Sequence, residues 1–258
     1  MACAAFVEAR RELQPHVGAT WTEIAGVYAM FDSVSSPITQ TFGLGIFDPF
    51  LGSQFEEIEA FFESRGAVTA HEVSGFADPE TLSLLSSRAY SPIESSVVLV
   101  RPTTLPAQES NTRIVVRSVS ENDAALYSRI AVQGWSSEVP ELIPFIEEMG
   151  SITTRARGTH CFLGELDGRP IAAAALTVHN GVALLAGACT IPEARRQGAQ
   201  LALLHARLTF AAKLGIDLAM VVTAPGSASH RNAERQGFRP VYTRAKWQRA
   251  LSGPQIRP

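Results

Sequence analysis

Two segments of regular hydrophobic periodicity flank a polar stretch near the middle of the chain. This stretch, Pro102–Thr112 (PTTLPAQESNT), contains two prolines and several turn-forming residues, so we interpret it as a linker. We therefore expect two structural units, residues 1–101 and 113–250, followed by a C-terminal tail, 251–258.

After the linker the pattern predicts a short strand, two helices and an antiparallel meander. Arg113–Arg117 is strand-like, Ser120 is expected to cap a helix reaching about Gln133, and Pro140–Met149 indicates a second helix. The hairpin dipeptides Asp167-Gly168 and Asn180-Gly181 then separate three β-like runs. These runs are Thr159–Leu166, Ile171–His179 and Val182–Ile191.

The period then becomes helical. Apolar residues recur at helical spacing from Leu201 to Ala211, and Gly215 is a typical helix stop. Further elements follow: a strand at Asp217–Thr223, a short helix capped by Ser227 and ending at Gly237, and a strand at Phe238–Trp247.

The first half shows a partial version of the same order. Ser53 and Glu56 form a capping-box pattern for a helix to Ser64 that Gly66 ends, and Asp78-Pro79 opens another helix to about Arg88. The predicted strands are Trp21–Phe31, Ile38–Ile46, Ala67–Val73 and Ser95–Arg101. Strand–helix–strand–helix–strand thus occurs twice, which suggests an internal duplication. We expect an α+β fold with a mixed, mostly antiparallel sheet flanked by helices.

Composition is that of an ordinary globular protein, with 46% hydrophobic and 18% charged residues. No apolar run approaches the roughly 18 residues that span a bilayer, and the N-terminus lacks the order of a signal peptide. We therefore expect a cytoplasmic protein without a membrane partner. Cys3, Cys161 and Cys189 are widely spaced, which favours neither a disulfide framework nor a metal site.

Charge is distributed unevenly along the chain. Residues 1–110 hold 5 Lys and Arg against 14 Asp and Glu, whereas residues 195–250 hold 10 against 2. Uneven solvated charge is one reading, and a polyanionic ligand on the second half is the other. Nothing else resembles a nucleic-acid motif, so we expect no nucleic-acid partner.

The stretch Thr190–Val222 has the features of an anion site. A strand ends before Pro192, and Arg195-Arg196-Gln197-Gly198-Ala199-Gln200 leads directly into an amphipathic helix. The first amides of a helix lack internal partners, and the helix dipole adds positive potential there. Gly198 lets the backbone approach phosphate oxygens closely. The Walker and dinucleotide fingerprints are absent.

Here the sequence resembles the GNAT acyltransferase superfamily. Arg195, Gly198 and Gln200 occupy the defining positions of its cofactor motif, and Asn232-Ala-Glu-Arg-Gln-Gly-Phe238 resembles its second signature. The resemblance covers about Arg113–Trp247. It implies a catalytic domain at 113–250 that uses acetyl-CoA, transferring the acyl group directly to an amine of a small molecule or peptide. The residues it implies for cofactor binding are Ala188, Cys189, Thr190, Arg195, Arg196, Gln197, Gly198, Ala199, Gln200, Ser229 and Asn232.

Two positions depart from the family pattern. Gln200 stands where glycine or alanine is usual, so its side chain must lie away from the diphosphate or bind it. Ala233 stands where many members place a tyrosine that protonates the departing thiolate, and the strand before the loop contains no carboxylate. Tyr242, His160 and Glu165 are our candidates for proton transfer, with His230 as an alternative acid. Trp135 is expected either to line an acceptor pocket or to pack in the core.

The first half resembles a degenerate, truncated copy of the same unit. Its corresponding loop carries Asp48, Glu56 and Glu57 and no arginine before the helix, so it would repel a diphosphate. We expect a lost cofactor site there. A non-catalytic acyl-CoA sensor is the alternative function, and a homodimer is left open as a partner.

Overall fold

The computed structural model describes residues 2–47, 51–105, 111, 113–138 and 140–249. The chain forms two compact units. Unit 1 comprises Met1–Pro15 and Val98–Val241, and unit 2 comprises His16–Val97 and Tyr242–Pro258. The expected tail and most of the expected linker lie outside the described residues.

Unit 1 contains the predicted meander. Strands β6 (Ile114–Ser118), β7 (Thr159–Leu166), β8 (Arg169–His179) and β9 (Val182–Thr190) pair antiparallel in sequence order. β10 (Leu218–Thr223) lies parallel to β9, and β5 (Tyr90–Pro102) follows β10 in the sheet. Both predicted hairpin turns are confirmed, because Asp167-Gly168 and Asn180-Gly181 have the positive φ angles of a type I′ turn.

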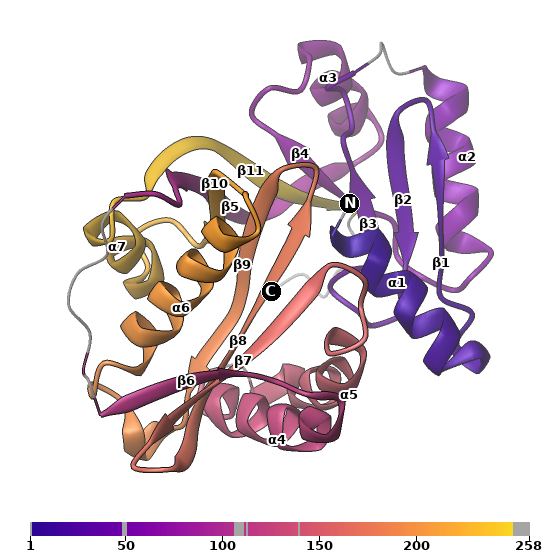
Figure 1. Cartoon of the computed structure of the whole chain (residues 1–258). Helices are drawn as coiled ribbons and strands as arrows, with labels where there is room; N and C mark the ends of the chain where they lie inside the picture. Colours follow the sequence, from indigo (N-terminus) through magenta and orange to yellow (C-terminus); the bar gives the residue numbers. More distant parts are fainter. Residues whose placement is uncertain (1, 48–50, 106–110, 112, 139, 250–258) are drawn as a thin grey trace, which may run out of the picture. The chain divides into compact units, whose positions relative to one another are not determined.

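Helices cover both faces of this sheet (Figure 1). α4 (Ala124–Trp135) and α5 (Ile143–Thr153) pack together on one face, and α6 (Ala199–Lys213) packs on the other. A Cβ at Gly164 would contact Leu203 of α6, whereas one at Gly134 of α4 would meet Cys189. α7 (Ala228–Arg235) lies next to β10. No helix among the described residues is long and apolar enough to cross a membrane.

The end of α6 and the start of α7 follow the sequence signals, whereas the start of α4 does not. The amide of Ile216 donates to Ala211 O beside the left-handed Gly215, which ends α6 as predicted. Ser227 accepts from the amide of His230 and caps α7. The predicted Ser120 cap is wrong: its hydroxyl donates to Asp123, and a 3-10 turn (Glu121–Asp123) precedes α4.

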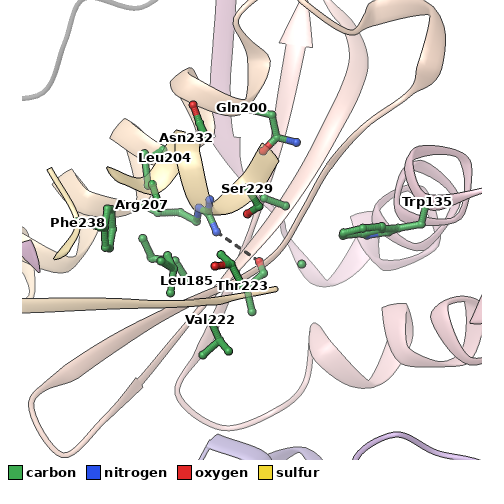
Figure 2. Close-up of a pocket in the computed structure, with 15 residues that line it drawn as sticks. Trp135, Leu185, Gln200, Leu204, Arg207, Val222, Thr223, Ser229, Asn232 and Phe238 are labelled. Carbon is green, nitrogen blue, oxygen red and sulfur yellow. Dashed lines mark hydrogen bonds between the residues drawn. The ribbon is translucent and has the colours of Figure 1, made fainter. Parts of the chain in front are cut away.

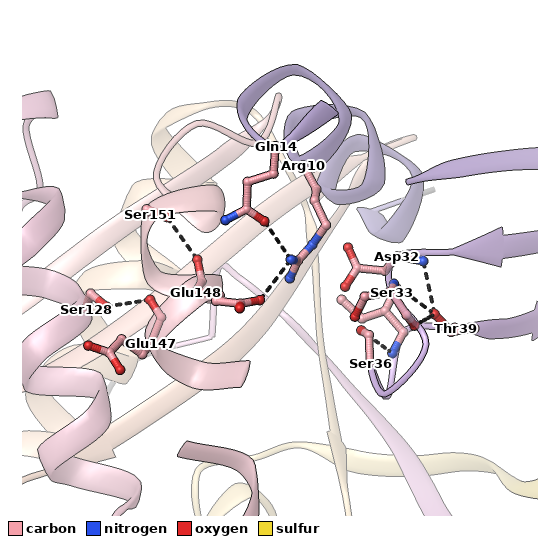
Figure 3. A network of polar contacts seen from close by, with 11 residues as sticks. Arg10, Gln14, Asp32, Ser33, Ser36, Thr39, Ser128, Glu147, Glu148 and Ser151 are labelled. Atoms are coloured by element: carbon pink, nitrogen blue, oxygen red, sulfur yellow. Dashed lines mark hydrogen bonds and ion pairs between the residues drawn. The ribbon is translucent and has the colours of Figure 1, made fainter. Parts of the chain in front are cut away.

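The N-terminal helix α1 (Ala2–Leu13) was not predicted from the pattern. It buries Phe6 and Val7 and packs against α5. Its Arg10 is also buried and donates to Gln14 and to Glu148 of α5, at 2.8 and 3.0 Å (Figure 3). These contacts explain why the first residues belong to unit 1 although the rest of the N-terminal half does not.

Unit 2 contains β1 (Thr20–Ile24), β2 (Val27–Phe31), β3 (Gln40–Phe42) and β4 (Ala70–Ser74) in that order in its sheet. The single strand predicted over Trp21–Phe31 is wrong, because a turn at Ala25-Gly26 divides it into the hairpin β1–β2. The turn after β2 is held by Thr39, whose hydroxyl accepts from the amide of Asp32 at 3.0 Å (Figure 3).

The helices of unit 2 are α2 (Gly52–Glu63) and α3 (Pro79–Ser87). The predicted capping box of Ser53 and Glu56 is wrong, since the amide of Leu51 donates to Gln54 at 2.8 Å and Glu56 pairs with Arg88. α3 is capped as predicted, by Asp78 accepting from the amide of Thr81. The core of this unit includes Phe55, Ile58, Phe62, Leu85 and Tyr90.

The two units repeat one motif, and the strands β5 and β11 (Arg239–Arg249) each have residues in both units. β3–α2–β4 and β9–α6–β10 are both parallel strand pairs joined by a helix, as expected for a duplication. β11 runs from unit 1 into unit 2, where it pairs antiparallel with β4. β5 passes from unit 2 into unit 1, where its last residues lie beside β10. The compact units therefore differ from the expected ranges 1–101 and 113–250.

Candidate active site

A pocket opens in unit 1 where β9 and β10 separate. The strands pair from Leu218–Val182 to Met220–Leu184. Beyond these pairs, Leu185–Ala188 of β9 and Val221–Thr223 of β10 line the pocket (Figure 2). Strands that stop pairing leave backbone N–H and C=O groups available to a bound ligand.

A β-bulge shapes the β9 side of this pocket. Ala173 pairs with Cys189 and Ala175 with Ala186, so Gly187 and Ala188 both lie opposite Ala174. Gly187 has a φ of +61°, in the left-handed region that glycine adopts without strain. A bulge leaves one residue outside the ladder and turns its backbone groups away from the neighbouring strand.

The predicted cofactor loop forms the start of α6. Gly198 is the N-cap residue with a φ of +92°, and the helix begins at Ala199 without a side-chain cap or an acidic first turn. Arg196 also has a positive φ, and its side chain is exposed. The side chain of Asn111 donates to Gln197 O at 2.9 Å and holds the loop. The helix amides are thus open to an anion.

The side chain of Arg195 points away from the α6 amides, toward the end of α4. Its Nη2 donates to Gly134 O at 3.1 Å and Ser137 Oγ at 3.0 Å, and it pairs with Glu138 at 3.0 Å. A cation at the carboxyl end of a helix is stabilised by the helix dipole. Arg195 therefore anchors the loop to α4, and Arg196 is the arginine of this loop left exposed.

Several other predicted cofactor residues meet in the pocket. Gln200, Ala188, Ser229 and Asn232 line it. Gln200 donates to Thr190 Oγ1 at 3.3 Å, so its longer side chain binds the preceding strand. Trp135 from the end of α4 and Ala233 from α7 also line the pocket. Cys189 is buried against α4, and burial raises the pKa of its thiol to about 12.

The three proton-transfer candidates are spread over the structure. His160 on β7 lies 4.6 Å from Phe210, ring centre to ring centre, and burial lowers its pKa. Glu165, also on β7, accepts from Nε of Arg117 at 2.7 Å. Neither is among the described residues that line the pocket. Tyr242 belongs to unit 2, with its ring 5.5 Å from that of Phe76.

One charged residue of the pocket was not predicted from the sequence. Arg207 projects from α6 into the pocket and is buried. It lies three residues after Leu204 and four before Ala211, so helical spacing places it on the apolar face of α6. The only signal in the sequence was the presence of an arginine inside a largely apolar stretch.

Comparisons with known proteins agree with this geometry. Residues 124–238 match the model of the acetyltransferase (GNAT) family. No curated protein matches this chain.

Solved structures share the fold of the chain. A GCN5-related N-acetyltransferase from Kribbella flavida is 19% identical, with a TM-score of 0.67 over 98% of this chain and 97% of that one. A tandem GNAT protein from the clavulanic acid biosynthesis pathway is 14% identical, with a TM-score of 0.57 over 79% of this chain and 70% of that one. A protein of unknown function from Staphylococcus epidermidis has a TM-score of 0.65 at 8% identity, over 90% and 94% of the two chains.

These structures show the fold, and the family match covers the segment that contains β9, the α6 loop and α7. Residues 124–238 are an acetyltransferase domain of the GNAT family.

Proposed function

We propose that this protein transfers an acetyl group from acetyl-CoA to an amine of a small molecule or peptide. The observation that carries the proposal is that one pocket joins three features: the separation of β9 and β10, the bulge at Gly187, and the uncapped start of α6. Together they provide backbone groups for an extended ligand and a binding site for its phosphates.

The cofactor would lie along the opening between the two strands. The amides that follow Gly198 would bind the diphosphate, with Arg196 adding charge at the surface. The backbone of Ala188–Thr190 would pair with the amide groups of the pantetheine arm, as an added strand does. Ser229 and Asn232, which line the pocket from α7, would contact the arm from the other side.

Transfer would be direct, without a covalent enzyme intermediate. The neutral amine attacks the thioester carbonyl, an N–C bond forms, and the C–S bond breaks with its electron pair leaving on sulfur. The enzyme contributes orientation and polarisation of the carbonyl oxygen. The backbone at the bulge of Gly187 and Ala188 is suited to that oxygen, because one residue of the pair has no ladder partner.

The proton-transfer roles of Tyr242, His160 and Glu165 remain proposals. Glu165 accepts from Arg117, which also pairs with Asp123, and this ion-pair arrangement favours a structural role for it. Removal of the proton from an ammonium acceptor through a water chain is the alternative to a side-chain base.

Turnover with a panel of amines tests the proposal. Purified protein is mixed with acetyl-CoA and each amine, and the release of free thiol is followed together with the mass of the acetylated product. An enzyme releases thiol in proportion to product. Saturable binding of acetyl-CoA without thiol release for any amine would favour the sensor, the reading consistent with Ala233 in place of an acid.

A further inference from the structure

The pocket contains a buried positive charge. Arg207 is only 4% exposed and lines the pocket. Its Nε donates to Leu203 O at 3.1 Å, and its Nη1 donates to Ala175 O at 3.0 Å. Nη1 also donates to Ala186 O at 3.3 Å (Figure 2). Nη2 makes no hydrogen bond to any residue that the structure describes. Backbone carbonyls therefore hold the guanidinium, and one nitrogen is left for a ligand.

Among the described residues, no group around Arg207 neutralises its charge. No carboxylate in the described part of the chain forms an ion pair with it. The titratable neighbour on the α4 side is Tyr127, whose pKa burial raises well above its usual value, so the phenol is neutral. Burial also raises the pKa of Cys161 and Cys189 to about 12. Burial lowers the pKa of Arg207 to about 10, which keeps it charged at neutral pH.

An unpaired buried cation is unfavourable unless a ligand supplies the opposite charge. The carbonyls of Ala175 and Ala186 reduce that cost but carry no net charge. Arg207 bonds to the strand residue immediately before the bulge, so its guanidinium lies close to Gly187, where the thioester is proposed to bind. The pocket also contains Ala233, which has no proton to give to the leaving sulfur.

We propose that Arg207 is a catalytic residue that stabilises the CoA sulfur as a thiolate, in place of an acid that protonates it. This rests on the proposed function. As the C–S bond breaks, its electron pair stays on sulfur, paired with the guanidinium. The amine proton passes to water or a base, and the thiolate takes a proton from water on release. A fixed charge aimed at developing negative charge is an effective form of transition-state stabilisation.

The ionisation of bound CoA tests this without turnover. The affinities of CoA and of desulfo-CoA, which lacks the thiol, are measured by calorimetry from pH 6 to 10. A nearby cation lowers the pKa of an acidic group by about 1–3 units. The preference for CoA over desulfo-CoA should therefore rise about 10-fold or more with pH. It should disappear in Arg207→Gln, which keeps only hydrogen bonding. In Arg207→Lys it should persist only up to the pH at which the buried ammonium group loses its proton.

Desulfo-CoA binding is the control for a merely structural role. If Arg207 only supports β9, Arg207→Gln would weaken CoA and desulfo-CoA equally, and the wild-type preference would not change with pH. That result overturns the inference and leaves the proposed function standing. Wild-type protein that binds neither ligand overturns both. With a turned-over amine, Arg207→Gln is expected to lower kcat about 10²–10³-fold, while Arg207→Lys recovers part of the loss.

Discussion

Replacing Gly198 by aspartate and by asparagine separates charge from shape at the proposed diphosphate site. Gly198 has a φ of +92°, and a Cβ there would lie 3.3 Å from Cβ of Asn111. Both replacements meet the same close contact and the same left-handed backbone, which costs about 1 kcal/mol for a residue other than glycine. Their side chains have nearly the same size, so the matched pair differs in one negative charge.

The size of the charge effect follows from Coulomb's law. A carboxylate on Gly198 would lie about 5 Å from a diphosphate bound at the α6 amides, and at an effective dielectric constant of about 20 the repulsion is roughly 3 kcal/mol. Each 1.4 kcal/mol changes affinity about tenfold. Gly198→Asp should therefore bind acetyl-CoA about 100-fold more weakly than Gly198→Asn at low salt. The gap should narrow as ionic strength rises.

Calorimetry with acetyl-CoA at two salt concentrations measures both affinities. Urea unfolding of each variant checks that the fold survives. The two variants should be equally stable, because the backbone strain is common to both. Equal affinities in folded Gly198→Asp and Gly198→Asn would refute the reasoning, since no diphosphate could then lie beside this residue. If both variants then bound acetyl-CoA more weakly than wild type by the same factor at both salt concentrations, that shared loss of affinity would come from strain in the loop alone.

Three further predictions concern unit 2. If Tyr242 is the general acid, Tyr242→Phe slows turnover by at least about 10²-fold with unchanged acetyl-CoA affinity; steady-state rates near wild type would remove Tyr242 from the mechanism. Titration should saturate at one acetyl-CoA per chain, because the helix of unit 2 that corresponds to α6 starts at an extended Leu51 and carries Glu56 in its second turn; two sites per chain would contradict this. Burial lowers the pKa of His71 from 6.5 to about 3, so the unfolded chain binds a proton first as pH falls. Wild type should thus lose more stability than His71→Gln between pH 6.5 and 3 in urea unfolding, and parallel pH curves would show that His71 does not contribute.

The sequence by itself determined the elements whose signals are local. Asp167-Gly168 and Asn180-Gly181 form the predicted turns, Gly215 ends α6, and Asp78 caps α3. In each case the deciding hydrogen bonds or dihedral angles lie within a few residues, so the pattern contains the information. The start of α6 also follows a local signal, because the left-handed Gly198 is its N-cap residue.

The direction of single side chains was decided by tertiary contacts. Arg195 and Arg196 are adjacent in the sequence and equally suited to a phosphate. Only the packing of α4 against β9 presents Gly134 O to Arg195 and leaves Arg196 exposed. Arg207 is the reverse case, since its burial depends on carbonyls of β8 and β9, which lie 32 and 21 residues away.

The tertiary structure also decided which strands complete each unit. The pattern predicted β5 and β11 as strands, but it contains nothing that selects their neighbours, since any free strand edge offers the same backbone N–H and C=O groups. β11 pairs with β4, more than 160 residues earlier in the chain, and β5 lies beside β10. Such pairings depend on the side chains that several elements bury together, and only the folded chain brings those side chains into contact.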